Sequence, residues 1–382
     1  MSAAERVDVA IVGGGPVGLL LGCLLLQNGV DARVFERRHT RSPHSRAVGV
    51  HPPGLDCLDA AGVAGPLMQR AVFVRHAFAF DERRTLGTID FSCLPGPFQF
   101  VLTVPQAHTE ELLERRLRTL HDRSYERGTQ VQACTLDRDH VTLFADDGQR
   151  VRSVEARFVV GCEGKHSLVR DAARIAYEGA PYRAHFMMAD TRDETPFGDA
   201  AAVFLTREGL VESFPMPGKM RRWVVGLGRN RQTPDLSVVE RVVRQRTGQR
   251  ANPDTATMVS AFCAEHFLAD TFVRGRAILA GDAAHVLSPI GGQGMNLGWL
   301  DAMLLAELLP RVLANNRINA LHAYHQERRT AARRAIRRAE AFMAVAAERP
   351  YAHGVAELTV RALLSDPLKA RAARLFTMHG LS

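Results

Sequence analysis

The 382-residue sequence predicts an α/β fold: a doubly wound Rossmann-like domain, an interleaved antiparallel-sheet domain and C-terminal helices. Three observations lead to this prediction. A β-α-β unit opens the chain, two later strands each run into a glycine-containing turn, and a strand pair typical of a hairpin lies between those later strands. The length favours two or three domains, because a domain usually contains about 100 to 200 residues.

The opening unit is predicted from apolar runs and their boundaries. Val7–Val12 resembles a buried parallel strand, and Pro16–Gln27 is long enough for a helix. This helix is apolar nearly all round, which predicts that it is buried, and Asn28-Gly29 is a C-terminal stop signal. A strand over Val30–Glu36 completes the unit.

Two later strands predict that the same domain is assembled from separated segments. Arg157–Gly161 leads into Cys162-Glu163-Gly164, and Arg276–Gly281 leads into Asp282. Between them, Leu210–Met216 and Arg221–Gly228 are strand-like and are joined by the turn composition Pro-Gly-Lys, which predicts an antiparallel second domain. We predict a discontinuous first domain over 1–75, 100–178 and 265–345, a second domain over 76–99 and 179–264, and a C-terminal helical segment over 346–382.

Composition excludes several classes of protein. The chain is 46% hydrophobic and 24% charged, unlike a disordered or collagen-like chain. The apolar stretch Val17–Leu26 is about half as long as a membrane helix, and no secretory signal precedes it. The six cysteines are far apart and have no zinc-binding spacing, so we expect no metal site, no disulfide framework and a cytoplasmic location.

A glycine motif follows the first strand. In Gly13-x-Gly15-x-x-Gly18 the glycines permit a tight turn, close approach of the backbone to a pyrophosphate and close helix packing. The N-terminus of the next helix supplies amide donors and partial positive charge. About twenty residues further on, Glu36 can accept both hydroxyls of an adenosine ribose. Arg37 and its neighbour Arg38 leave two interpretations open, a 2′-phosphate contact as in NADP or solvated surface arginines.

A second segment, residues 275–296, reads GRAILAGDAAHVLSPIGGQGMN. A strand here delivers Asp282 to a cofactor, and a glycine-rich loop opens a helix at about Gly294. Taken alone, Asp282 could be a helix N-cap, so its meaning depends on the first motif. His285, three residues later, is either a neighbour of the cofactor or a histidine satisfied within its own turn.

The ordered motifs resemble those of FAD-dependent single-component aromatic hydroxylases, flavoprotein monooxygenases with the para-hydroxybenzoate hydroxylase fold. The resemblance covers about residues 5 to 310. It includes Ser45-Arg46-Ala47, Val104-Pro105-Gln106, Thr109-Glu110, Gly161-Cys162-Glu163-Gly164 and Gly281-Asp282. The chain is similar to the compact members, because the helix-like residues after Pro310 are too few for the extra thioredoxin-like domain of larger relatives.

The resemblance implies non-covalently bound FAD and a set of residues around it. The glycines of the first motif would lie at the pyrophosphate, Glu36 at the adenosine ribose, and Asp282 at the ribityl or pyrophosphate part. Pro289–Asn296 would line the isoalloxazine, where helix amides stabilise the anionic charge of a reduced flavin. The candidate cofactor-binding residues are Gly13, Gly15, Pro16, Gly18, Glu36, Arg37, Arg46, Gln106, Glu163, Gly281, Asp282, Pro289, Gly292, Gly294, Met295 and Asn296.

The resemblance also implies a reaction. NADPH or NADH would reduce FAD, and a flavin C4a-hydroperoxide formed with O2 would hydroxylate an aromatic or polyketide-like small molecule. The antiparallel sheet would cover the flavin ring. A one-residue change of strand register would invert which of its side chains face the substrate, and no catalytic acid or base is identified. The side chains expected to supply the pocket and the sheet core between them are Phe186, Met188, Phe204, Phe214, Met216 and Trp223. All of these except Met188 are the candidate substrate contacts.

Two departures from the family pattern keep other functions open. The middle motif usually reads Ala-Asp-Gly, whereas this chain has Cys162-Glu163-Gly164, and His51-Pro52-Pro53-Gly54 replaces an Arg-Thr-Leu-Glu run. The longer Glu163 side chain must re-aim any hydrogen bond, which bears on the use of a nicotinamide donor. The alternatives are an FAD-dependent reductase of isoprenoid-type double bonds and a non-catalytic flavin-binding protein.

A basic strip occurs at helical spacing towards the C-terminal end. Such a strip can contact nucleic acid or anionic lipid, and the net charge of +8 does not choose between partners. A solvated helix face with Glu327 and Glu340 as partners is the more frequent arrangement, so we expect no nucleic-acid partner. The oligomeric state is left open. The strip consists of Arg328, Arg329, Arg333, Arg334, Arg337 and Arg338.

Overall fold

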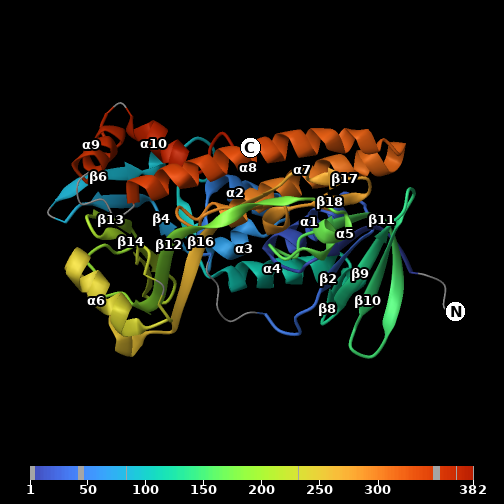
Figure 1. The fold of residues 1–382 in the computed structure, drawn as a ribbon, viewed down its shortest axis with the longest axis horizontal. Coiled ribbons are helices and arrows are strands. Elements are labelled where there is room, and N and C mark those ends of the chain that lie inside the picture. The colour runs from blue at the N-terminus through green and yellow to red at the C-terminus, as the bar shows by residue number, and fades with distance from the viewer. Residues whose placement is uncertain are drawn as a thin grey trace.

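Two large β-sheets and a set of helices make up the computed structural model, which describes residues 5–41, 47–82, 84–230, 232–346, 353–366 and 368–381. Within these residues there are two eight-stranded sheets and one three-stranded sheet. The first large sheet and the second lie at opposite ends of an elongated molecule, and a long helix, α8, runs along both (Figure 1). The predicted α/β class with an antiparallel second sheet is confirmed.

The first sheet is built around the opening strand. β1 pairs in parallel with β2 on one side and with β11 on the other, and β11 continues in parallel to β18. β9 and β10 add an antiparallel extension to β11. Its strands are β1 (Glu5–Val12), β2 (Ala32–Glu36), β8 (Tyr125–Arg127), β9 (Gln130–Leu136), β10 (Val141–Asp146), β11 (Val151–Gly161), β17 (Val273–Arg274) and β18 (Ala277–Leu279).

The predicted helix of the opening unit is α1 (Pro16–Gln27), and every residue from Val17 to Leu25 in it is buried. It packs against α4 and α7, so an apolar surface all round is what its position requires. The main hydrophobic core fills the space between these helices and the first sheet. The other helices of this part are α2 (Pro52–Ala60), α3 (Ala64–Met68), α4 (Gln106–Leu120), α5 (Leu168–Ala172) and α7 (Gly294–Asn315).

The second sheet has the strand order β19-β16-β12-β15-β14-β13-β5-β6 and is antiparallel except where β13 meets β5. The predicted hairpin is present: Met216 pairs with Met220, and Gly218 and Lys219 turn the chain with positive φ. Its strands are β5 (His76–Phe80), β6 (Thr85–Asp90), β12 (Tyr177–Arg192), β13 (Ala201–Thr206), β14 (Gly209–Met216), β15 (Met220–Gly226), β16 (Met258–Ala269) and β19 (His285–Val286).

The two faces of the second sheet meet different partners. One face packs against α6 (Leu236–Thr247), whose apolar stripe is made of valines, with Asp235 as N-cap and Gly248 as left-handed C-cap. The opposite face packs against α8 and against Ile290 of the loop before α7. The small third sheet, β3 (Gly49–Val50), β7 (Val101–Thr103) and β4 (Val72–Val74), packs against β14 of the second sheet.

In the described residues, α7 is followed by the α-helices α8 (Leu321–Ala346), α9 (His353–Leu363) and α10 (Lys369–Phe376). α9 and α10 pack against β6 at the end of the second sheet, as Figure 1 shows. No helix in the described ranges has both the length and the apolar character required to cross a bilayer. The predicted domain boundaries stay a prediction.

Candidate functional site

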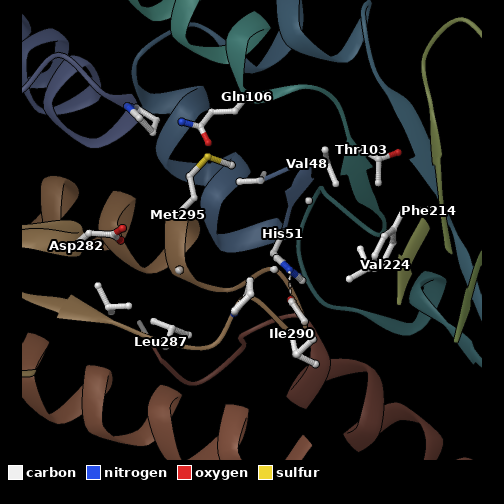
Figure 2. Close-up of a pocket in the computed structure, with 18 of the residues that line it drawn as sticks. Val48, His51, Thr103, Gln106, Phe214, Val224, Asp282, Leu287, Ile290 and Met295 are labelled. Atoms are coloured by element: carbon white, nitrogen blue, oxygen red, sulfur yellow. Dashed lines mark hydrogen bonds between the residues drawn. The ribbon is translucent and has the colours of Figure 1, made fainter. Parts of the chain in front are cut away.

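A cavity of about 950 Å³ lies between the carboxyl ends of the parallel strands and one face of the second sheet. The carboxyl ends of parallel strands are where α/β sheets usually bind ligands. Figure 2 shows one region of the cavity, with Gln106 and Met295 on one side, Phe214 and Val224 on the other, and His51 between them. Segments from both predicted domains therefore meet around one space.

The glycines after β1 have separate roles. A Cβ atom on Gly13, whose φ is +107°, would lie 2.5 Å from the backbone of Cys162, and one on Gly18 would lie 2.0 Å from the carbonyl oxygen of Gly13. These two glycines let β1, β11 and α1 approach one another. A Cβ atom on Gly15 would meet no atom of the described residues within 4 Å, and Gly15 lines the cavity. A ligand can thus approach the backbone at Gly15.

The N-terminus of α1 opens towards the same space. Pro16, its first residue, lines the cavity, and no side chain caps the free amide groups of the first turn. Uncapped amides at a helix N-terminus attract anions, phosphate groups above all. α7 offers a second N-terminus without a side-chain cap, beside Gly292, Gly294 and Met295, which also line the cavity.

Glu36 lies at the end of β2, as the motif predicts, and its carboxylate is largely buried. It accepts hydrogen bonds from the Gly14 N–H at 2.9 Å and from the Arg38 N–H and Nε, each at 2.9 Å. Burial alone would raise the pKa of Glu36, but these hydrogen bonds and the charge of Arg38 outweigh it and hold the pKa below its ordinary value. The group stays ionised, and with three hydrogen bonds made it keeps about one of its roughly four acceptor positions for a ribose hydroxyl.

The other candidates near this end are placed as follows. Arg37 is exposed and lines the cavity beside Arg38. Gln106 lines it from the first turn of α4, where its Nε2 donates to Glu110 Oε1 at 2.7 Å. Arg46 lies outside the described residues. Arg37 and Arg38 thus form a positively charged edge of the cavity, which suits a phosphate group. Gln106 adds a polar amide to the cavity wall.

Glu163 lines the cavity just after β11. One carboxylate oxygen, Oε1, accepts from the Val169 N–H at 2.9 Å, while Oε2 is buried without a hydrogen-bond partner in the described structure. Burial raises the pKa of Glu163 to about 7. Because Oε2 is also closed to solvent, Glu163 meets the cavity through other atoms of the residue.

The loop after β18 is fixed by a buried ion cluster. Asp301 of α7 accepts from the Gly281 N–H at 3.0 Å, from His285 Nε2 at 2.6 Å and from Arg328 Nε at 2.8 Å. Tyr177 donates to the Asp282 carbonyl oxygen at 2.7 Å, which leaves the Asp282 carboxylate facing the cavity (Figure 2). These hydrogen bonds fix the backbone at Gly281 and Asp282, so the Asp282 carboxylate is kept where a ligand in the cavity can reach it.

This cluster corrects two expectations. His285 is fully buried and bound to Asp301, so it is not a neighbour of the cavity. Arg328 is 1% exposed and pairs with the same carboxylate, so it does not belong to a solvated basic strip. For both residues the cause is Asp301, a buried carboxylate on α7 that accepts hydrogen bonds from them, and sequence spacing does not reveal this pairing.

The loop 289–296 is tied to α2 by side-chain hydrogen bonds. Asn296 Oδ1 accepts from the His51 N–H at 2.9 Å, and its Nδ2 donates to the carbonyl oxygens of Gly49 and Gly292 at 3.1 and 3.0 Å. Pro289 lines the cavity, whereas Asn296, like Gly18 and Gly281, does not. Gly18, Gly281 and Asn296 therefore support the loops that line the cavity and are not themselves part of its wall.

The predicted substrate-facing residues are divided by strand alternation. Phe214 and Met188 line the cavity. Phe204 and Trp223 lie on the opposite face, in the core under α6, so they are corrected to sheet-core residues. Phe186 packs on Phe262 without reaching the cavity wall, and the buried Met216 does not line it. Side chains alternate between faces, and the sequence did not settle the register.

Several lining residues were not predicted. The second sheet adds Val203, Leu205, Glu212 and Val224, and the turn before α2 adds His51. His51 was noted only as a departure from the family pattern, and Glu212 was hidden inside an apolar strand. α9, the residue that follows it and α10 contribute a further apolar set that only the tertiary structure brings to the cavity: Val360, Leu363, Leu364, Ala372, Leu375 and Phe376.

These features fit FAD. Open space above Gly15, an uncapped helix N-terminus and the ionised Glu36 suit a pyrophosphate and an adenosine ribose. The second uncapped helix N-terminus suits a ring system that becomes anionic on reduction. The apolar face of the second sheet leaves room for a further molecule next to that ring.

Comparison with known proteins agrees with this geometry. A family model described as FAD binding domain matches residues 6–339. The chain is 31% identical over 345 residues to an uncharacterized aromatic compound monooxygenase of Bacillus subtilis, a match that covers 88% of this chain and 68% of the relative. It is 32% identical over 375 residues to a 12-dehydrotetracycline 5-monooxygenase/anhydrotetracycline 6-monooxygenase of Streptomyces rimosus, which covers 94% and 73%.

The fold is similar to a solved structure over almost its full length. The crystal structure of p-nitrophenol 4-monooxygenase from Pseudomonas putida superposes with a TM-score of 0.89, covers 98% of this chain and 99% of that one, and is 23% identical in sequence. At this level of identity the likeness concerns the fold alone. It supports the arrangement of a parallel sheet, an antiparallel sheet and C-terminal helices.

Proposed function

The chain belongs to the FAD-binding-domain family that includes the FAD-dependent aromatic monooxygenases, and we propose that it uses NADPH or NADH and O2 to hydroxylate an aromatic or polyketide-like small molecule. The continuity of one cavity carries this proposal. The same space runs from the dinucleotide-type contacts at Gly15 and Glu36 to an apolar sheet face around Phe214 and Val224.

The proposed reaction transfers one oxygen atom of O2 to the substrate and reduces the other to water. NAD(P)H, a proton, O2 and a substrate C–H bond give NAD(P)⁺, water and a substrate C–OH bond. When bound, FAD would accept the hydride and activate O2 as its C4a-hydroperoxide, which is the chemistry that no side chain supplies. The protein has to hold the ring, place the substrate carbon and exclude water.

The residues of this chain divide these tasks. The α1 N-terminus and Gly15 would hold the pyrophosphate, Glu36 the adenosine ribose, and Asp282 the ribityl part. Gln106, Glu163 and the loop at Gly292–Met295 would surround the ring system. Apolar side chains of the second sheet and of α9 and α10 would exclude water from the reacting atoms.

An anaerobic titration tests the proposal. The purified protein should show the visible absorption of oxidised flavin, and NADPH or NADH added without oxygen should bleach it; slow bleaching before an aromatic ligand is added still fits. With O2 readmitted, an aromatic substrate panel should give product and consumed oxygen in equal amounts. Reduction without oxygen insertion would favour the double-bond reductase, and flavin that no donor reduces would favour the non-catalytic protein. Failure to retain or reconstitute flavin contradicts all three.

A further inference from the structure

One carboxylic acid lies on the sheet face that lines the cavity. Glu212 on β14 shares this face with Leu210 and Phe214, and its cross-strand neighbours are Val203 and Val224. The Glu212 side chain is nearly buried, with 5% of the residue exposed. A carboxyl group among apolar side chains is unfavourable unless its oxygen atoms have partners. Its position therefore needs an explanation other than packing.

The protein supplies only part of the hydrogen bonding that this carboxyl can make. The backbone N–H of Gly291 lies near Glu212 and favours its ionised form, while the Gly291 carbonyl oxygen lies 3.1 Å from His51 Nε2. A carboxylate offers about four lone-pair positions, so most of them remain available to a molecule in the cavity. Within the described part of the chain, no ion pair to Glu212 is found.

The neighbouring groups add no positive charge that would neutralise Glu212. Burial lowers the pKa of His51 to about 4, so this imidazole is neutral, and its Nδ1 has no partner among the described residues. Arg222 of β15 lines the cavity, but its Nε and Nη2 bind the two Asp190 oxygens at 2.6 and 2.7 Å. The loop before α7 contributes Gly291, and α8 contributes the apolar Phe342.

We propose that Glu212 is a catalytic residue that binds the hydroxyl group of a neutral phenolic substrate and accepts its proton during oxygen transfer, an inference that rests on the proposed function. The substrate O–H bond breaks, its proton passes to a Glu212 oxygen, and the electron pair left behind makes a ring carbon more nucleophilic. That carbon gains one oxygen atom of O2, and the other oxygen atom is reduced to water with electrons from NAD(P)H. The ring carbon then releases its own proton to solvent, and Glu212 returns the first proton to the phenolic oxygen.

The protonation behaviour of Glu212 agrees with this role. Burial raises its pKa to about 7, so both forms are available near neutral pH, the condition that favours general acid–base work. The ionised form only accepts hydrogen bonds and selects a hydroxyl donor. The protonated form can also donate, for example to an ether oxygen. Selectivity for a hydroxyl group should therefore depend on pH.

The experiment compares 1-naphthol with its methyl ether, 1-methoxynaphthalene, on the FAD-loaded protein without oxygen. Dissociation constants come from the perturbation of flavin absorption at about pH 6 and about pH 8. The wild type should prefer naphthol about tenfold at the higher pH and less at the lower pH. E212Q keeps an acceptor for the Gly291 N–H but cannot titrate, so its preference should collapse and become independent of pH. E240Q, which removes a surface carboxylate paired with Arg244, should behave like the wild type.

The outcomes are separable. Three results would each overturn the role of Glu212. Naphthol does not bind, the wild type binds both probes equally at both pH values, or E212Q keeps the pH dependence of the wild type. Loss of flavin by the wild type contradicts the proposed function instead. If E212Q alone fails to retain FAD, E212D decides: a shortened carboxyl should keep the pH dependence with a weaker preference, and a pH-independent preference in it overturns the inference.

Discussion

The glycines of the first loop differ in what surrounds their Cα atoms. Gly13 and Gly18 have no room for a side chain, because backbone atoms of neighbouring segments occupy that space. Gly15 has open space and an ordinary φ of −78°, so its glycine identity is not required by the fold. We therefore attribute the need for a glycine at position 15 to the molecule that binds in the cavity.

Replacing Gly15 should therefore separate binding from folding. In Gly15→Val the side chain would occupy the space proposed for the pyrophosphate, and we expect FAD affinity to fall at least about 100-fold, or about 2.7 kcal/mol. The unfolding temperature of the flavin-free protein should change by no more than about 2 °C. Flavin absorbance after gel filtration and thermal unfolding measure the two effects.

Gly65→Ala is the matched control, because Gly65 in α3 also has open space but lies away from the cavity. It should retain FAD fully. A Gly15→Val protein with full flavin content would contradict a pyrophosphate site at the N-terminus of α1.

At the scale of elements, the C-terminal helices close the cavity. α10 carries Phe376, whose ring centroid lies 6.0 Å from that of His51 and 6.0 Å from that of Phe91. α9 and α10 together add an apolar wall next to the sheet face that holds Glu212. Exclusion of water at this position would protect oxygen transfer from loss as hydrogen peroxide.

Shortening Phe376 should therefore uncouple the reaction. In Phe376→Ala we expect the fraction of oxidised NAD(P)H that appears as hydrogen peroxide to rise about twofold or more, with FAD content unchanged, because the side chain is only half-buried and does not touch the dinucleotide end. Peroxide and product are measured in the same assay. Phe144→Ala, on the solvent-exposed side of β10, is the control. Unchanged peroxide release would show that α10 does not seal the cavity.

At the scale of the whole molecule, the cavity lies between two sheets with separate hydrophobic cores. A dinucleotide bound there would contact the carboxyl ends of the first sheet and reach the face of the second. A ligand that binds only the folded state stabilises it in proportion to the logarithm of its concentration. FAD should thus contribute to the stability of the entire chain.

Removal of FAD should lower the unfolding temperature, and its return should restore it. At an FAD concentration of about 100 times the dissociation constant, the free energy of unfolding should rise by about 2.7 kcal/mol. Thermal unfolding across an FAD series measures this, with Gly15→Val as a variant that should not respond. An unfolding temperature independent of FAD would contradict a binding site in this cavity.

Prediction from sequence succeeded where short-range patterns carry the information. The helix Pro16–Gln27 is found with the predicted bounds, and the hairpin around Gly218 is present, because apolar period and turn chemistry are local. It failed for Phe204, Trp223 and Arg328, whose surroundings depend on strand register and on the partner Asp301. Long-range pairing of this kind leaves no local signal.

The sequence by itself determined the FAD-binding fold, because the glycine motif, the acidic residue at the end of the second strand and the Gly-Asp segment are fixed by what a dinucleotide requires of the backbone. Only the tertiary structure decided which side chains of the second sheet face the cavity, because strand register determines the face on which each side chain lies. It also brought Glu212 next to Gly291 and placed α9 and α10 over the cavity. These contacts join residues distant in the chain, and only folding brings them together.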